Sequence, residues 1–212
     1  MKTALFSLLF IFCIAAQAQD IRLENASFED EPQDATMPQR WHSCKDGSTP
    51  DILPGFWGVY LEPFDGDSYV GLITREDGTY EVIGQRLVEP IKAKECYTFS
   101  IQLAYSKAYA KYDIPIRLRI YGGGSRCSKE QLLCESPTIT NTDWKEYQFD
   151  IFSKADYQYV IFEAFYAKGI SFPYRGNLLI DDISVWKRCP RADLIKTSPV
   201  RKTLAFLEYP HN

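Results

Sequence analysis

The sequence predicts an all-β domain in which two antiparallel sheets pack face to face. Apolar and polar residues alternate with a period of two through about eight segments, as they do in half-buried strands. Turn residues such as Gly, Pro, Asn and Asp separate these segments. Aromatic residues make up 15% of the 212-residue chain, and such rings suit pleated sheets. The hydrophobic fraction of 45% and the charged fraction of 25% are those of an ordinary globular domain.

Four strands are expected in the first half of the chain. They are residues 21–24, 69–73, 80–87 and 97–105, with a long polar loop that contains prolines after the first. The fourth alternates most clearly, because Tyr97, Phe99 and Ile101 share one face while Thr98 and Ser100 share the other. Strands that bury alternate residues need a second sheet to cover them, so a sandwich is expected.

Four more strands are expected in the second half. They are residues 114–121, 145–152, 158–167 and 177–187. The segment 158–167 is apolar on both faces apart from Glu163, which predicts a central strand. A single helical turn is expected near residues 128–133. Alternation ends after Pro190, and we expect a tail there with a short edge strand at 204–207.

The first 18 residues have the pattern of a signal peptide. Lys2 supplies a positive charge, residues 5–15 are largely apolar, and Ala16-Gln17-Ala18 matches the small-x-small cleavage signal. A retained membrane anchor is the alternative, but the apolar run is too short to cross a bilayer. We therefore expect a signal peptide at 1–18, a β-sandwich at 19–189 and a tail at 190–212. Export would lead to the periplasm, the cell surface or the extracellular space, with no transmembrane segment in the mature chain.

Export would expose the cysteines to an oxidising compartment, where some should form disulfides. Cleavage would leave five of the six cysteines. Cys127 and Cys134 flank a short insert, which favours a local bridge. Cys96 opens one strand and Cys189 closes the last, which favours a second bridge. Cys44 would then be unpaired, although spacing alone leaves other connectivities open.

Composition and motifs count against several kinds of function. A net charge of -4 without a basic run lacks the electrostatic footprint of a nucleic-acid binder. His42 and His211 are the only histidines and the cysteines are dispersed without a CxxC pair, which counts against a zinc site. No nucleophile motif accompanies either histidine, so Ser–His catalysis is not expected. Carboxylate pairs for glycoside hydrolysis stay open, because 28 acidic residues offer many combinations.

Polar residues on three strands form a first candidate ligand-binding surface. Gln102, Arg117, Arg119, Tyr121 and Glu163 all lie opposite core-facing residues, on strands that could be neighbours. Planar donors, an acid and a ring suit a sugar, whose hydroxyls and apolar face need such partners. The alternative for the charged members is a cross-strand lattice of ion pairs on a solvated sheet.

Aromatic residues in loops form a second candidate surface. Trp57, Tyr109 and Tyr112 lie between the expected strands, which places them at the rim of the sandwich. A ring at a loop tip can stack on the apolar face of a sugar.

Two segments at the ends of the domain have distinctive sequences: Leu23-Glu-Asn-Ala-Ser-Phe-Glu29, followed by Trp41, and Asn177-Leu-Leu-Ile-Asp-Asp-Ile-Ser-Val185. They resemble the opening and the last strand of the galactose-binding-like jelly rolls, the fold of many carbohydrate-binding modules. Segments 66–72, 85–87 and 96–100 lie between them in the family's order. The pattern is also similar to exported bacterial sandwich domains that serve as surface-protein modules. The resemblance covers residues 20–187.

The resemblance implies a jelly roll, and in many family members a structural calcium ion joins the first and last strands. Carried over residue by residue, it implies Glu29 and Asp181 as ligands. The alternation places Asp181 inward with Leu179 and Ile183, where a carboxylate needs a cation or hydrogen-bond donors. Calcium and hydrogen bonds from backbone amides of the opening strand therefore both stay open.

We therefore expect an exported, non-catalytic domain like a carbohydrate-binding module, which binds a glycan or another cell-surface component. No cofactor other than the calcium ion is expected. The alternative is a structural or adhesive domain of a surface assembly without a small-molecule ligand. A glycoside hydrolase ranks third.

Overall fold

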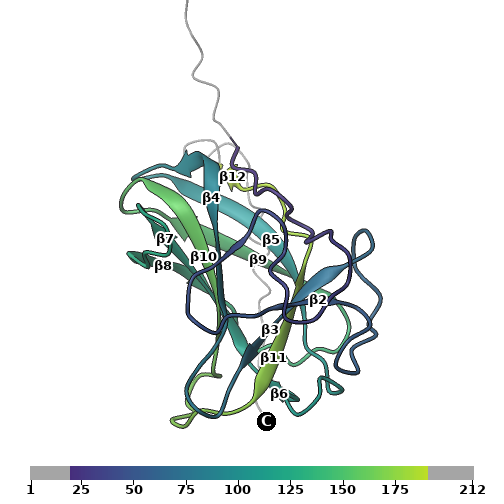
Figure 1. The fold of residues 1–212 in the computed structure, drawn as a ribbon. Helices are drawn as coiled ribbons and strands as arrows, with labels where there is room; N and C mark the ends of the chain where they lie inside the picture. Colours follow the sequence, from purple (N-terminus) through teal and green to yellow (C-terminus); the bar gives the residue numbers. More distant parts are fainter. Residues whose placement is uncertain (1–19, 191–212) are drawn as a thin grey trace, which may run out of the picture.

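Two sheets packed face to face form the fold, as predicted, in a computed structural model that describes residues 20–190 (Figure 1). No helix occurs within that range. The first sheet contains five antiparallel strands in the order β1, β4, β10, β7, β8. Their bounds are β1 His42–Ser43, β4 Val82–Ile91, β10 Tyr157–Phe165, β7 Arg117–Gly123 and β8 Gln131–Glu135.

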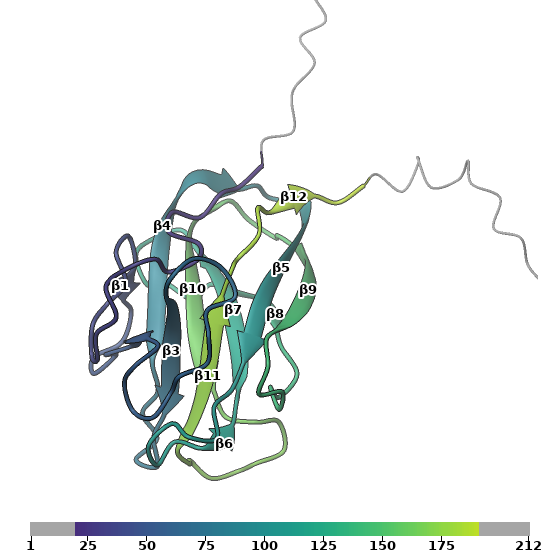
Figure 2. The same ribbon diagram turned by 90° about the vertical axis from the view of Figure 1, so that its right-hand side faces the viewer.

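The second sheet contains seven strands and is built around β5. Their bounds are β2 Asp51–Leu53, β3 Tyr69–Thr74, β5 Cys96–Ala104, β6 Ile114–Pro115, β9 Lys145–Phe152, β11 Gly176–Asp181 and β12 Lys187–Arg188. β9 runs along one edge of β5, while β12 and β11 share the other edge end to end. β3 and β2 follow β11, and β6 pairs in parallel with the start of β11. In both views β12 lies at the top of the sandwich and β6 at the bottom (Figures 1 and 2).

The main core lies between the sheets and contains the alternate residues that the sequence marks as apolar. Tyr97, Phe99 and Ile101 of β5 are all buried. Trp186 stacks on Phe99 with the two ring centroids 4.0 Å apart. Burying one side chain of this size stabilises a fold by about 1.5–3 kcal/mol, so the core supplies the main favourable term.

A second apolar cluster covers the outer face of the second sheet. Tyr69 and Ile73 of β3 and Leu179 of β11 belong to it, and they alternate with residues of the main core. Val59 and Tyr109 from loops close over these strand residues. Because this sheet is covered on both faces, every residue of β3 and β11 is buried.

Three predicted strands are interrupted or shorter in the structure. The predicted strand 114–121 is two elements, because β6 belongs to the second sheet and β7 to the first. The predicted opening strand 21–24 is only an isolated bridge between Ile21 and Trp186. The predicted last strand 177–187 ends at Asp181, and β12 follows as a separate strand paired with β5.

The prediction of a helical turn at residues 128–133 is wrong. The segment leads into β8, where pairing with β7 and contacts of Leu133 and Cys134 with the main core outweigh local helix preference. β1 and β2 also form inside the segment that the sequence predicts as a long loop. The predicted signal peptide and the predicted edge strand at 204–207 lie outside the described residues. Nowhere in residues 20–190 does a helix have the length and apolarity needed to cross a membrane.

Two disulfides join distant parts of the chain. Cys96 pairs with Cys189, as predicted, because β12 lies antiparallel to the start of β5. The predicted Cys127–Cys134 bridge is wrong, since Cys127 pairs with Cys44. Cys134, rather than Cys44, is the unpaired cysteine of the described part of the chain. Cys134 lies on β8 and packs against the main core, and burial raises the pKa of its thiol to about 12.

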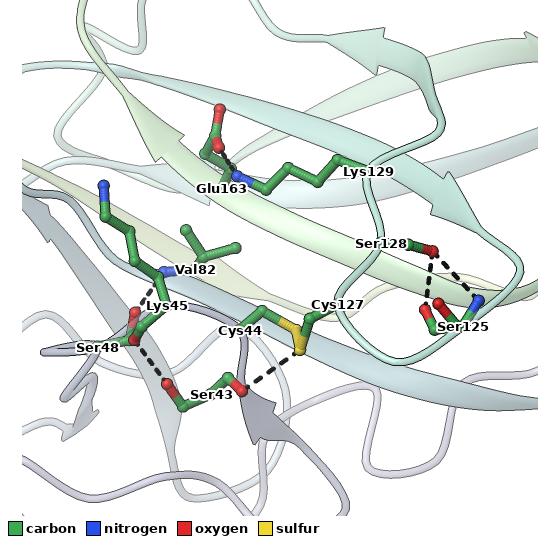
Figure 3. The surroundings of a disulfide bond; sticks show 10 residues. All are labelled: Ser43, Cys44, Lys45, Ser48, Val82, Ser125, Cys127, Ser128, Lys129 and Glu163. Carbon is green, nitrogen blue, oxygen red and sulfur yellow. Dashed lines mark hydrogen bonds and ion pairs between the residues drawn. A yellow bond between two sulfur atoms is a disulfide. The ribbon is translucent and has the colours of Figure 1, made fainter.

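The Cys44–Cys127 disulfide lies across the outer face of the first sheet (Figure 3). It joins the loop after β1 to the loop between β7 and β8. A Cβ at Gly84 of β4 would lie 2.7 Å from the Cys44 sulfur, so only glycine fits beneath this bridge. The sheet face is therefore partly covered by two loops that are covalently joined to each other.

Oxidised protein comprising residues 19–212 is unfolded without a reductant and treated with an alkylating reagent. We expect Cys134 alone to react, because the other four cysteines are held in disulfides. Peptide mass spectrometry locates the label. A label on Cys44 with a protected Cys134 would contradict the connectivity.

Replacing Cys44 and Cys127 together by serine should lower the free energy of unfolding by about 2–5 kcal/mol, because the unfolded chain loses a long covalent loop. Urea unfolding measures the change. Cys134→Ala is the matched control: it keeps both disulfides, places no polar group against the core and should lower the free energy of unfolding by about 1 kcal/mol.

Candidate functional site

A cleft of about 370 Å³ opens where β3 ends and where β6 and β11 begin. Trp57 reaches it from the loop between β2 and β3, and Tyr109 and Tyr112 reach it from the loop between β5 and β6. Arg75, just after β3, and Arg175, just before β11, also line it. The three loop aromatics that the sequence singles out therefore meet at one cleft.

Trp57 stands at this cleft with 47% of its surface exposed. It adopts a positive φ of 55°, and the next residue, Gly58, adopts 82°. The amide of Ala110 donates a 2.9 Å hydrogen bond to the Trp57 carbonyl oxygen. This bond joins the two loops, so the position of the indole depends on both of them.

The floor of the cleft contains a buried acid–phenol pair. The Tyr109 hydroxyl donates to Oδ2 of Asp51, and the Ala35 amide donates to Oδ1 at 2.7 Å. The Tyr109 ring lies against Gly71 of β3, where a Cβ would come within 2.8 Å of the Tyr109 hydroxyl oxygen. Glycine at position 71 therefore leaves the space that the ring occupies.

Burial perturbs the pKa values of both groups of this pair. Burial raises the pKa of Asp51 above its ordinary value, and the hydrogen bond from Tyr109 opposes that rise. Burial and the nearby Asp51 charge raise the pKa of Tyr109 well above its ordinary value. The phenol therefore stays protonated at neutral pH and donates to the acid.

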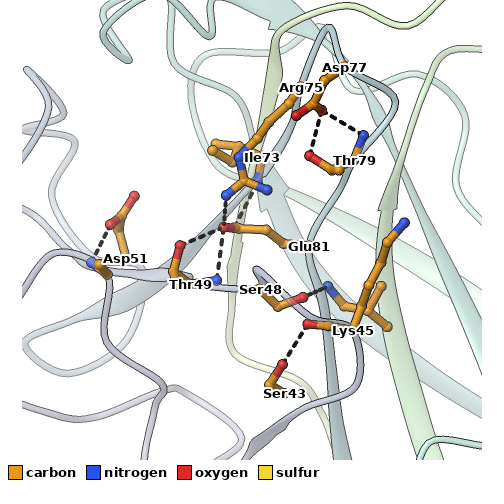
Figure 4. Close-up of polar contacts among 12 residues, drawn as sticks. Ser43, Lys45, Ser48, Thr49, Asp51, Ile73, Arg75, Asp77, Thr79 and Glu81 are labelled. Carbon is orange, nitrogen blue, oxygen red and sulfur yellow. Dashed lines mark hydrogen bonds and ion pairs between the residues drawn. The ribbon is translucent and has the colours of Figure 1, made fainter.

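A buried carboxylate positions Arg75 at the cleft (Figure 4). Nη2 of Arg75 lies 2.8 Å from Oε1 of Glu81, and the amides of Thr49 and Ile73 donate to the same carboxylate. Burial raises the pKa of the Glu81 carboxyl to about 7, even though the nearby Arg75 charge opposes this rise. The Arg75 side chain is 22% exposed and Glu81 only 1%, so the guanidinium lines the cleft and its counter-ion does not.

Arg175 and Lys111 add two more cations to the lining. The Arg175 guanidinium lies 5.9 Å from the centroid of the Tyr112 ring and pairs with Glu76. Lys111 is exposed, adopts a positive φ of 66° and forms no ion pair with any residue from 20 to 190. The cleft therefore has three cations at its wall and one buried acid in its floor.

The first surface that the sequence predicts is divided between the two sheets. Arg117, Arg119, Tyr121 and Glu163 lie on the outer face of the first sheet, where Glu163 pairs in register with Arg119. The expectation that the Gln102 strand lies beside them is wrong. Gln102 is on β5 of the second sheet, because the chain crosses between β6 and β7.

The charged residues of the first sheet pair with one another. Arg117 Nη1 lies 2.8 Å from Glu135 Oε2, and Arg119 Nη1 lies 3.5 Å from Glu163 Oε1. Lys129 also pairs with Glu163, which is 2% exposed (Figure 3). This is the ion-pair lattice that the sequence leaves open as the alternative. Its donors are largely used within the protein.

The proposed calcium ligands occupy a different part of the molecule. Asp181 is buried on the outer face of the second sheet rather than inward, because Leu178 and Ile180 are the residues that face the main core. Its Oδ2 accepts from the amides of Phe64 and Asp65, and its Oδ1 accepts from the Asp182 amide.

Backbone amides donate hydrogen bonds to both carboxylates of this pair. Glu29 is exposed, and its Oε2 accepts from the Asp67 amide at 2.8 Å. The donors to Asp181 come from the loop before β3 and from Asp182, not from the opening segment as the hydrogen-bonding alternative assumed. A calcium ion joining Glu29 and Asp181 stays a prediction.

Sequence reasoning missed the five polar residues of the cleft, which are Thr49, Asp51, Arg75, Lys111 and Arg175. Asp51 had a readable signal, since it stands alone among apolar residues in Pro50-Asp-Ile-Leu53. Arg75 and Arg175 had none, because each lies in a polar turn segment that looks solvated. Their importance comes from the pairing of β3 with β11, which brings the two turns to the same end of the sheet.

Comparison with solved structures shows the kind of sandwich. The CBM22-1 xylan-binding domain of Xyn10C from Paenibacillus barcinonensis has a TM-score of 0.50 at 14% identity, over 82% of this chain and 97% of that domain. The K1 cleaved adhesin domain of Lys-gingipain from Porphyromonas gingivalis W83 has a TM-score of 0.50 at 14% identity, over 77% and 96%. No protein family and no curated protein matches by sequence. The chain therefore has the β-sandwich fold of carbohydrate-binding modules and adhesin domains, as the resemblance implied.

The free energy of unfolding should depend on pH because the pKa of Asp181 is raised in the folded protein. Burial, with a further contribution from the Glu29 charge, raises the pKa of Asp181 to about 7 against an ordinary 3.8. The folded state then binds a proton that the unfolded state releases. This contribution is complete below pH 3.8 and is lost as pH rises to 7, at about 1.4 kcal/mol for each pKa unit.

A chelator is added to remove calcium, and urea unfolding measures the free energy of unfolding of the wild type and of Asp181→Asn. The free energy of the wild type relative to that of the variant should fall between pH 4.5 and pH 7.5. Calcium added at pH 7.5 should raise the melting temperature of the wild type and not of the variant. An unchanged melting temperature of the wild type on chelation would remove the calcium prediction.

Proposed function

We propose that this protein is an exported, non-catalytic module that binds a glycan in the cleft at Trp57, Tyr109 and Tyr112. The observation that carries the proposal is the convergence of loop aromatics and side-chain hydrogen-bond donors on one concave site. Glycans need this combination, because they present hydroxyls around their edges and patches of C–H groups on their faces.

The indole of Trp57 is the ring best placed to stack on a sugar. It is exposed at the cleft, and its backbone is joined to the opposite loop by the hydrogen bond from Ala110. A ring that is positioned before binding loses little conformational freedom when a ligand arrives. Tyr109 is 2% exposed and serves as the floor, so Trp57 and the half-buried Tyr112 supply the contact.

Two other surfaces suit a glycan less well. The lattice on the first sheet uses its arginines and lysines in ion pairs with Glu135 and Glu163. A groove of about 460 Å³ beside β5, β9 and β12 is lined mainly by polar residues, and its one ring, Phe99, is buried. Neither surface offers an exposed ring beside unused donors.

The cleft also lacks the arrangement of a glycoside hydrolase. Such enzymes place two carboxyl groups on either side of the scissile bond. Of the described residues, Asp51 is the only acid that lines the cleft, and its two oxygens accept from Tyr109 and Ala35. This supports binding without catalysis. The two disulfides fit an oxidising compartment, which supports export.

Trp57→Ala should weaken glycan binding at least about tenfold, since the stacking surface is lost. A glycan array identifies ligands of residues 19–212, and calorimetry with the best one measures the affinity. Tyr60→Ala is the matched control, because Tyr60 belongs to the same loop and is 71% exposed but does not line the cleft. Its affinity should stay within about twofold of the wild type.

Arg119→Ala tests whether the glycan binds in the cleft or on the ion-pair lattice of the first sheet. It should lower the melting temperature, because Glu163 loses a partner, and leave the glycan affinity unchanged. If Arg119→Ala abolishes binding while Trp57→Ala does not, the ligand binds on the first sheet. If no glycan binds at all, the structural or adhesive alternative replaces this proposal.

A further inference from the structure

We propose that the ligand of the cleft is an anionic glycan, which carries carboxylate or sulfate groups. This inference rests on the proposed function, and it narrows the class of glycan. Its basis is an imbalance in the lining, where the N–H donors of three cations accompany a single carboxylate, that of Asp51. The imbalance stands out because the whole chain is acidic, with a net charge of -4.

Three cationic side chains supply the donors. The guanidinium groups of Arg75 and Arg175 each have five N–H donors, and the ammonium group of Lys111 has three. Each arginine spends one nitrogen on an acid outside the cleft lining, Glu81 or Glu76. Because a guanidinium is a planar fork, the remaining nitrogens can still bind a carboxylate or sulfate through two oxygens.

The side-chain acceptors of the lining are fewer than its donors. Each oxygen of Asp51 already accepts a hydrogen bond, one from the Tyr109 hydroxyl and one from the Ala35 amide. The Thr49 hydroxyl lies 3.4 Å from the Glu81 carboxylate, to which it donates, and its oxygen remains an acceptor. A neutral sugar hydroxyl must donate as well as accept, and this lining gives its proton few partners. An anionic oxygen only accepts, so it matches the cleft better.

Contacts within the protein help to position both arginines at the cleft. The Arg175 guanidinium lies 5.9 Å from the centroid of the Tyr112 ring, within the range of a cation–π contact. Glu81 is buried behind Arg75 and fixes its direction. A positioned arginine binds an anion without first giving up side-chain freedom, which favours affinity.

The binding experiment uses pairs of glycans that differ only in charge. One pair is an oligogalacturonate and its methyl ester, which tests carboxylate. The other is a sulfated galactan oligosaccharide and its desulfated form, which tests sulfate. Calorimetry with residues 19–212 should give at least about tenfold tighter binding to the anionic member of one pair, and the affinity should fall as salt concentration rises.

Two substitutions test whether the cleft cations carry this preference. Arg175→Gln and Lys111→Asn remove charge, and asparagine tolerates the positive φ at position 111. The double variant should bind the anionic glycan at least about tenfold more weakly and lose most of the salt dependence. Lys187→Gln is the matched control: it removes one exposed positive charge from β12, away from the cleft, and should change the affinity by less than about twofold.

The outcomes separate this inference from the function on which it rests. Equal affinity for both members of each pair, without salt dependence and with loss of binding in Trp57→Ala, overturns the anionic preference and keeps the glycan-binding proposal. An anionic preference that survives in the double variant also overturns the inference, because residues other than Arg175 and Lys111 then bind the anionic group of the glycan. No binding to any of the four glycans or to the array overturns both proposals.

Discussion

The outer face of the second sheet needs a cover, and most of the structure that concerns function follows from this need. Tyr69, Ile73 and Leu179 point away from the main core, yet they are apolar and buried. Uncovered, they would expose a large hydrophobic patch to water. The loops after β2 and β5 lie over them, and Tyr109 fills the space above Gly71. The cleft forms where the two loops and the ends of β3 and β11 meet, so the covering of the sheet and the site share the same residues.

The outer face of the first sheet is covered largely by charged side chains instead. It contains a carboxylate, Glu163, that is almost completely buried, and a buried carboxylate is costly unless cations surround it. Arg119 comes from the neighbouring strand and Lys129 from the loop joined to Cys44 through Cys127. The disulfide and the ion pairs therefore support one another. A face built this way contributes to structure, and most of its charged groups are paired within the protein, although Nε of Arg119 is buried without a hydrogen-bond partner.

Alternation in the sequence predicts the long strands well, because a strand that buries one face leaves a period of two. Residues 145–152 match β9 at both ends, and β5 and β10 differ from their predictions by one or two residues. Alternation says nothing about which sheet a strand joins, so the separation of Gln102 from Arg119 could not be foreseen. Nor does it reveal pairing over long distances in the chain, which decided that Cys127 meets Cys44. The loop rings were recognisable by type, whereas Arg75 and Arg175 became neighbours only through the pairing of β3 and β11.

The bridge between Ile21 and Trp186 has a consequence for how the domain can be attached. It places the first and last parts of the described chain side by side, at the β12 end of the sandwich (Figures 1 and 2). The cleft lies near β6, at the other end. The two ends of the described chain and the cleft therefore lie at opposite ends of the domain. A polymer bound in the cleft, as proposed, would not compete for space with a partner at the β12 end.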